Sequence, residues 1–284
     1  MKTLAVLLCL CAQLCVCKGL AARAAVGARA AVGARAAMGA RAAARTALRS
    51  AQPALDCKEQ TLSRRNDNAL ERCGIYILCV LLCTICSDTT CWSDIGFDYT
   101  RNFVPVAKRL LKQRGKSMQM VSVSILELLN RVLPKAMREF FRSKYQENSQ
   151  YICSASSQWF SFGFIEWLVG PAERFDVQVR VTGEGGSREE VWQSGVKLVE
   201  CRFLVESQCK SACVHLCKTP TQALFRQELG VPLYMKPNYD DCSCEFFFGV
   251  EPPPLAEDPA ITGGCYTQCS LRRVGCVDDK EQKS

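Results

Sequence analysis

The sequence lacks several features on which common enzyme mechanisms depend. It contains a single histidine, His215, so a facial triad of two histidines and one carboxylate cannot form within one subunit. A Ser-His-Asp or Cys-His mechanism would have to use this same histidine, which stands between Cys213 and Cys217. The sequence also has no glycine-rich loop of the Walker or dinucleotide-binding type. Histidine-based catalysis and nucleotide binding are therefore disfavoured as functions.

Acidic residues are absent from residues 1–50, which hold eight of the 36 Lys and Arg. The rest of the chain has as many basic as acidic residues, 28 of each, although the net charge of the whole chain is +8. The excess positive charge is thus confined to the N-terminal segment. A basic surface for polyanions is not predicted, and we expect no nucleic-acid partner.

The N-terminal segment has the composition of a targeting leader. Lys2 followed by an apolar run is typical of a secretory signal peptide, which we assign to residues 1–17. Residues 18–54 form an Ala-rich, low-complexity leader and linker in which Arg recurs every six residues, as in a transit peptide. The two signals in series predict import into a complex plastid (chloroplast). The alternative is a low-complexity linker in a secreted protein.

The sequence also lacks a long hydrophobic run after the leader. The longest apolar stretch, CGIYILCVLLCTIC at residues 73–86, suits a buried helix better than a membrane span. Its cysteines are most simply interpreted as small hydrophobic residues of the core. Sixteen of the 20 cysteines follow the leader, and their number alone does not distinguish disulfides from thiols or metal ligands.

Hydrophobic periodicity predicts an α+β fold. Residues 102–114, 120–133 and 135–145 have helical patterns, with a break at Pro134. Residues 175–181 alternate as a strand does, and a glycine-rich turn leads to a second predicted strand at 196–205. We expect a helical region at 55–170 packed on a small, sheet-containing, cysteine-rich region at 171–284.

An aromatic-rich stretch joins these two regions. It is interpreted as core packing of the helical layer or, alternatively, as the lining of a groove for a long apolar ligand. The groove interpretation rests on five side chains: Trp159, Phe162, Phe164, Trp167 and Phe225.

The strongest chemical signal is a group of cysteines and acids at 201–276. Cys209, Cys213 and Cys217 stand four residues apart, so a helix would place them on one face. Several separate segments thus offer both thiolates and carboxylates, the donors that iron or zinc requires. The spacing matches neither zinc fingers nor common ferredoxins, so a purely structural thiol cluster is the alternative.

Helix-capping signals follow the three cysteines. Thr219 with Pro220 and Gln222 has the pattern of a helix N-terminus, and Gly230 is typical of a helix end. The sequence therefore predicts a short, separate helix over 220–229.

These segments together resemble the plastid family of iron-dependent β-carotene isomerases of the strigolactone pathway, known from dwarf mutants. The resemblance is carried by CRFLVESQCKSACVHLCKTPTQALF (201–225), GVPLYMKPNYDDCSCEFFFG (230–249), PPPLAEDP (252–259) and CYTQC (265–269). FVPVAKRLL (103–111), SILELLNRVLP (124–134) and FIEWLVGPAE (164–173) are also similar to the family. The resemblance extends over about residues 66–270.

The resemblance implies an iron-dependent enzyme that interconverts all-trans and 9-cis β-carotene, or a related carotenoid. It implies metal-site candidates at seven positions: Cys201, Cys209, Cys213, Cys217, Cys244, Cys265 and Cys269. It implies catalytic acids at three more: Glu206, Asp241 and Glu245. His215 stands where the family is expected to have Asn, Cys242 stands at a Met-like position, and residues 73–91 hold more cysteines than expected.

The expected mechanism is one-electron chemistry at iron, which would weaken a conjugated double bond so that it can rotate. The expected partners are the carotenoid and, peripherally, a membrane surface; the sequence gives no indication of oligomeric state. Two alternatives remain open at this point: a non-enzymatic carotenoid-binding plastid protein, and a secreted, disulfide-bonded binding module.

Overall fold

The computed structural model describes residues 67–112, 117–161, 166–183 and 186–262. The chain divides into Met1–Ala54 and Leu55–Ser284, and every described residue belongs to the second unit. The predicted leader and Cys265 and Cys269 lie outside the described residues.

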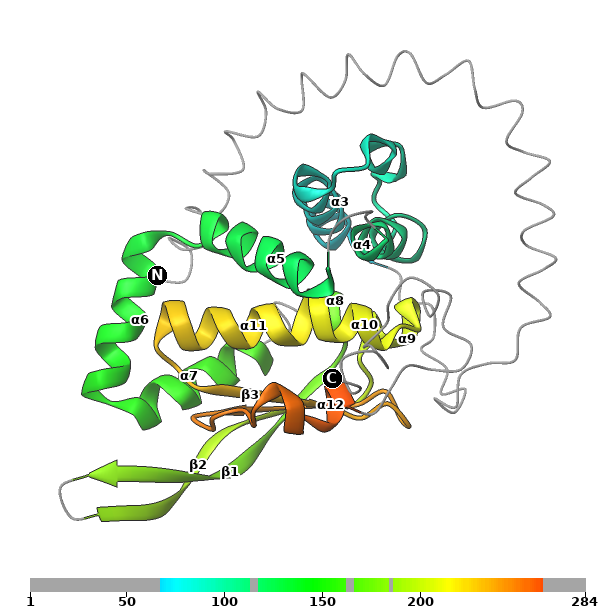
Figure 1. Ribbon diagram of the computed structural model, residues 1–284. Helices are drawn as coiled ribbons and strands as arrows, with labels where there is room; N and C mark the ends of the chain where they lie inside the picture. Colours follow the sequence, from blue (N-terminus) through cyan, green and yellow to red (C-terminus); the bar gives the residue numbers. More distant parts are fainter. Residues whose placement is uncertain (1–66, 113–116, 162–165, 184–185, 263–284) are drawn as a thin grey trace, which may run out of the picture. The chain divides into compact units, whose positions relative to one another are not determined.

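Helices make up the first part of this unit, as the sequence predicts (Figure 1). They are α3 (Ala69–Ile85), the 3-10 helix η2 (Thr89–Asp94), the π-helical η3 (Tyr99–Phe103), α4 (Val104–Leu111), α5 (Met118–Val132), α6 (Lys135–Glu147), α7 (Ser149–Ser161) and α8 (Glu166–Val169). The predicted core helix at 73–86 corresponds to α3, whose Ile75, Cys79 and Cys83 are buried. No helix in the described ranges is long and apolar enough to cross a membrane.

The start of α3 is set by a capping box. The Asn68 side chain accepts the backbone N–H groups of Leu70 and Glu71, and Glu71 in turn accepts the backbone N–H of Asn68 at 2.8 Å. Such reciprocal bonds satisfy donors that the first helical turn would otherwise leave unpaired. The helix therefore begins at a fixed residue just after Asp67.

A four-stranded antiparallel sheet follows in the order β1-β2-β4-β3. Its strands are β1 (Ala172–Gly183), β2 (Gly186–Leu198), β3 (Leu233–Pro237) and β4 (Cys244–Phe248). This arrangement of a helical part followed by a sheet confirms the α+β fold class (Figure 1).

The predicted hairpin is present, but the extent of its second strand is a correction. β2 covers Gly186–Leu198 and ends before Cys201, and Arg202–Ser207 form the helix α9. The prediction of a strand over 196–205 was wrong because Phe203 and Leu204 belong to a buried helix. A short apolar run looks the same in a buried strand and in a buried helix.

One continuous helical segment carries the predicted cysteine cluster and the next helix. It consists of α10 (Lys210–Ala212), the π-helical η4 (Cys213–Lys218), α11 (Thr219–Ala223) and the π-helical η5 (Leu224–Leu229), shown in yellow in Figure 1. It ends at Gly230, whose φ of 70° is left-handed, as predicted. The predicted separate helix over 220–229 is wrong: Thr219 lies inside the segment, and its N–H bonds to the Val214 carbonyl.

The core lies where this segment, α7 and the sheet meet. α7 packs on β1, β2 and β4, and the segment lies against α5 and β3. Phe160 of α7 contacts Phe225, Phe246 and Phe248 at ring-centroid distances of 5.9, 5.7 and 5.4 Å. Phe225 is thus a core residue, which corrects its prediction as a groove residue, and the predicted groove residues Phe162 and Phe164 lie outside the described residues. Two short helices, η6 (Leu255–Glu257) and α12 (Pro259–Thr262), follow the sheet.

Candidate functional site

Four of the predicted metal-site cysteines line one small cavity beside the sheet. Cys201 is the N-cap residue of α9, Cys213 and Cys217 lie on η4, and Cys244 begins β4. Apolar side chains complete the wall together with Lys218; they are Val169, Leu198, Phe203, Leu204, Met235, Pro237 and Phe246. The structure thus brings thiols together from three separate segments of the chain, and we call them the cavity cysteines.

The cavity has room for about one water molecule or one ion. Its volume is ≈ 10 Å³ for the centre of a water-sized sphere, which is about what one water molecule or one ion needs. All four cavity cysteines are free thiols, and three of them are buried while Cys217 is half-buried. The site is therefore a nearly closed, sulfur-lined space.

The other predicted site residues do not line this cavity. Cys209 caps α10, where its sulfur accepts the Ala212 N–H at 3.4 Å. It therefore precedes the helix and, contrary to the prediction, does not lie on one helix face with Cys213 and Cys217. Glu206 accepts a hydrogen bond from Thr100 at 2.9 Å, and the exposed Asp241 accepts the Ser243 N–H at 2.8 Å. Glu245 is partly exposed on β4, opposite Lys197 and Lys236. The catalytic roles of these three acids stay predictions.

The backbone around Cys201 and Cys244 is held by a tight link. Cys201 donates its N–H to the Cys242 carbonyl at 2.7 Å. Cys242 is disulfide-bonded and has a φ of 58°, in the left-handed region that side chains other than Gly rarely adopt. This link holds the start of α9 beside the start of β4.

Burial keeps the cavity cysteines protonated. Loss of solvent raises the pKa of Cys201, raises those of Cys213 and Cys244 well above the usual value, and raises that of Cys217 to about 12. Repulsion from neighbouring sulfurs adds to the rise for Cys213, Cys217 and Cys244. Without a cation, the cavity therefore contains neutral thiols.

A buried lysine opposes the effect of burial on three of the thiol pKa values. Lys218 lowers the thiol pKa values of Cys213, Cys217 and Cys244 electrostatically. Its Nζ lies 2.7 Å from Asp258 Oδ2, with both side chains only 1% exposed. The ammonium also donates to the Met235 carbonyl and to Gln222 Oε1, the latter at 3.2 Å. A buried ion pair is thus fixed beside the cavity, with its lysine in the cavity wall.

Sequence reasoning did not find Lys218 or Asp258 as site residues. They lie 40 positions apart, and nothing in either local pattern indicates that they meet. The available signal was a lysine on an otherwise buried helix, because lysine is almost never fully buried unless it is paired.

A second buried cation, Arg202, is the first residue of α9. Arg202 forms a two-bond pair with Asp67, at 2.6 and 2.8 Å, and donates to the Trp167 carbonyl at 2.7 Å. Its guanidinium lies 4.0 Å from the ring centre of Tyr99, and burial raises the Tyr99 pKa well above its usual value. This cluster anchors α9, and with it Cys201.

The chain can now be compared with known proteins. A family model described as β-carotene isomerase D27-like, C-terminal, matches residues 167–257, which include all four cavity cysteines. The protein is 32% identical over 228 residues to a chloroplastic β-carotene isomerase D27 of Medicago truncatula, covering 78% of this chain and 83% of that relative. The chain belongs to the β-carotene isomerase D27-like family.

A second relative extends the comparison. A chloroplastic β-carotene isomerase D27 of Arabidopsis thaliana is 34% identical over 149 residues, which cover 52% of this chain and 53% of that protein. Family membership makes this D27-like chain an isomerase, and the chloroplastic relatives support the predicted plastid location. No solved structure matches the chain.

The donor chemistry of the cavity suits an iron ion, although the site is not preformed. Burial keeps these thiols neutral because an uncompensated thiolate charge is costly away from water. A cation that replaces the protons compensates that charge and so removes the cost. However, no three Cys, His, Asp or Glu residues within the described ranges are already placed to hold a metal ion. Metal binding here would thus require the cavity side chains to reorient.

Proposed function

We propose that this protein is a carotenoid cis–trans isomerase that interconverts all-trans and 9-cis β-carotene, or a related carotenoid, with the help of iron. The observation that carries the proposal is the convergence of four free thiols, three of them buried and one half-buried, on one cavity, in a chain whose relatives are named β-carotene isomerases. The reaction would be the first step toward strigolactone-like apocarotenoids.

The cavity cysteines are the residues that would hold the iron. Iron bound there would supply one-electron chemistry that lowers the barrier to rotation about a conjugated double bond. The cavity has room for an ion and not for a polyene, so the carotenoid would lie outside it. The predicted apolar groove and peripheral membrane contact remain parts of this proposal.

The protein's own groups set the electrical environment of the bound ion. Four deprotonated thiols would add negative charge to a site enclosed by apolar side chains. The Lys218 ammonium, fixed by Asp258 and the Met235 carbonyl, would compensate part of that charge. The apolar wall would exclude water and so strengthen these interactions.

The proposal is tested by incubating the protein anaerobically with all-trans or 9-cis β-carotene, with and without added iron, and separating the isomers chromatographically. We expect an iron-dependent approach to one isomer ratio from both starting materials. Protein shown to contain iron that converts neither isomer would contradict the substrate assignment. That outcome would favour the alternative function, a non-enzymatic carotenoid-binding plastid protein.

The route to the plastid is a further part of the proposal. A signal peptide at 1–17 followed by a transit-like leader at 18–54 would direct the chain to a complex plastid through the secretory system. A fluorescent fusion to residues 1–54 that accumulates outside plastids would contradict this route.

A further inference from the structure

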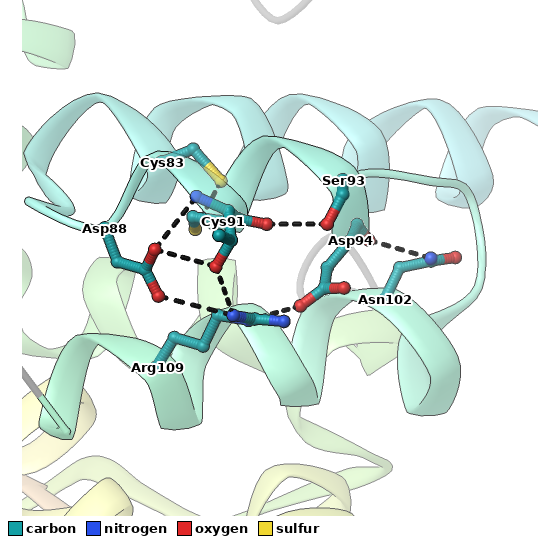
Figure 2. A network of polar contacts seen from close by, with 8 residues as sticks. Cys83, Asp88, Cys91, Ser93, Asp94, Asn102 and Arg109 are labelled. Atoms are coloured by element: carbon teal, nitrogen blue, oxygen red, sulfur yellow. Dashed lines mark hydrogen bonds and ion pairs between the residues drawn. The ribbon is translucent and has the colours of Figure 1, made fainter. Parts of the chain in front are cut away.

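A second group of cysteines lies away from the cavity, where α3 meets η2. The sulfur atoms of Cys83 and Cys91 are 2.6 Å apart, and both side chains are buried (Figure 2). Both are free thiols. A disulfide bond is about 2.05 Å long, so the two atoms are about half an ångström from bonding distance.

The short distance argues against a metal ion between these two sulfurs. Two thiolates bound to one tetrahedral ion at about 2.3 Å each would lie roughly 3.7 Å apart. The chemistry open to two sulfurs in direct contact is formation of a bond between them.

The backbone on both sides of the pair is already fixed. Cys91 donates its N–H to the Asp88 carbonyl at 3.0 Å, and the Asp88 side chain caps η2 through Thr90. Arg109 of α4 holds the same turn from below, through Asp94 at 2.5 Å and Thr90 at 2.6 Å (Figure 2). Hydrogen bonds thus hold the backbone of this turn while the two sulfur atoms lie in contact.

A third thiol gives this pair access to solvent. Cys86 follows the last residue of α3, is half-buried, and donates its N–H to the Cys83 carbonyl at 3.3 Å. Burial is the main cause that raises the pKa of Cys91, followed by contact with Cys83, and the Cys86 side chain adds to the rise through electrostatic repulsion and a hydrogen bond. A reagent that reaches Cys86 is thus one exchange step away from the buried pair.

We propose that Cys83 and Cys91 form a reversible disulfide by exchange with a small-molecule disulfide such as oxidised glutathione, and that Cys86 is the thiol that meets it. This inference does not depend on the isomerase function. We call Cys83, Cys86 and Cys91 the N-terminal cysteines.

The exchange balances in three steps. The Cys86 thiol attacks the small disulfide, forms a mixed disulfide and releases one small thiol. Cys91 then attacks the Cys86 sulfur and releases the second small thiol, which leaves a Cys86–Cys91 bond. Cys83 finally attacks Cys91, which restores the Cys86 thiol. Two protein thiols are oxidised, one small disulfide is reduced to two thiols, and the protons pass to those thiols.

The test uses the full-length protein equilibrated with a series of reduced-to-oxidised glutathione ratios. After acid quenching and blocking of free thiols, cleavage before aspartate places Cys91 on the peptide 88–93, apart from Cys83 and Cys86 on 67–87. We expect mass spectrometry to find 88–93 joined to Cys83, with the link removed by reduced glutathione. Absence of this link at every ratio, or its appearance only in urea-unfolded protein, would overturn the proposal.

Three variants sharpen the test. Cys83→Ser should abolish the link to Cys83, whereas Cys153→Ser should not change its yield, because Cys153 is a buried thiol of α7 whose raised pKa involves no neighbouring sulfur. Cys86→Ser should slow link formation by about tenfold or more without changing the final yield. An unchanged rate in Cys86→Ser would overturn the role given to Cys86.

Discussion

The cavity cysteines and the N-terminal cysteines are two groups of free thiols in one chain, with opposite surroundings. The cavity cysteines come from three separate segments and surround a space of about one ion, with a buried lysine in the wall. The N-terminal cysteines lie within nine residues of sequence, and two of them touch. The cation that acts electrostatically on Cys83 is Arg109, which is partly exposed and paired with aspartates.

This contrast teaches that cysteine content alone does not indicate the chemistry. Thiols around a space can receive a cation, whereas thiols in contact can be oxidised to a disulfide. A third setting is that of Cys153, a buried thiol whose pKa is raised to about 12 by loss of solvent alone, and which acts as a small hydrophobic residue.

The largest expected effect concerns the buried charge that distinguishes the cavity. Lys218→Met would leave Asp258 as a buried carboxylate without its cation, and should lower the free energy of unfolding by about 3–5 kcal/mol. Urea unfolding measures this change. The control is Lys236→Met on the exposed face of β3, which should stay within about 0.5 kcal/mol of the parent protein. Equal effects of the two substitutions would show that the buried pair does not form.

The next prediction separates the two thiol groups by function. Cys213→Ser should reduce bound iron and lower isomerase turnover by roughly 100-fold, because a hydroxyl is a poor replacement for a thiolate ligand. Cys83→Ser should leave the bound iron and the isomerase turnover within about twofold of the values of the parent protein. Iron analysis and the isomer assay on the same preparations test this, and equal losses in the two variants would contradict the proposed division.

The smallest expected effect concerns His215, which lies on η4 between Cys213 and Cys217 and hydrogen-bonds Ser122 of α5 at 3.2 Å. Burial lowers its pKa from 6.5 to about 4, so between these values the unfolded chain binds the proton more readily. Its contribution to stability is therefore complete above pH 6.5 and is lost as the pH falls toward 4. Iron-free protein should lose about 2 kcal/mol from this source between pH 7 and pH 5.

The matched variant for this prediction is His215→Asn, which carries no titrating group at that position. Urea unfolding at pH 7 and pH 5 measures how far the free energy of unfolding falls between the two values. The fall should be about 2 kcal/mol smaller in the variant than in the parent protein. The same pH dependence in both proteins would assign the effect to other groups.

Much of the fold could be predicted because it is locally encoded. The apolar run of α3, the break at Pro134 and the helix end at Gly230 each depend on near neighbours in sequence. The end of β2 could not be predicted, because residues 196–205 mix apolar and charged side chains without a clear period. The continuity of the helix through Thr219 was hidden because π-helical turns allow a capping-like sequence in the middle of a helix.

The site was predicted in its residue types and less well in its geometry. Cys201, Cys213, Cys217 and Cys244 were all chosen from sequence, and the structure brings them to one cavity. Cys209 was grouped with them by its spacing, but it lies at a helix start, where the four-residue rule does not apply. The pairing of Lys218 with Asp258 depends on tertiary packing, which no local pattern records.

The ion pair between Asp67 and Arg202 bears on the proposed removal of the leader. Asp67 is the first described residue, and its carboxylate is only 10% exposed because it pairs with Arg202 from the helix that Cys201 begins. If a protease removes the proposed leader, a cut before this residue keeps the pair intact. A cut a few residues later would strip the guanidinium of its counterion and α3 of its Asn68 cap. The start of α3 thus depends on Arg202, a residue 135 positions later in the chain.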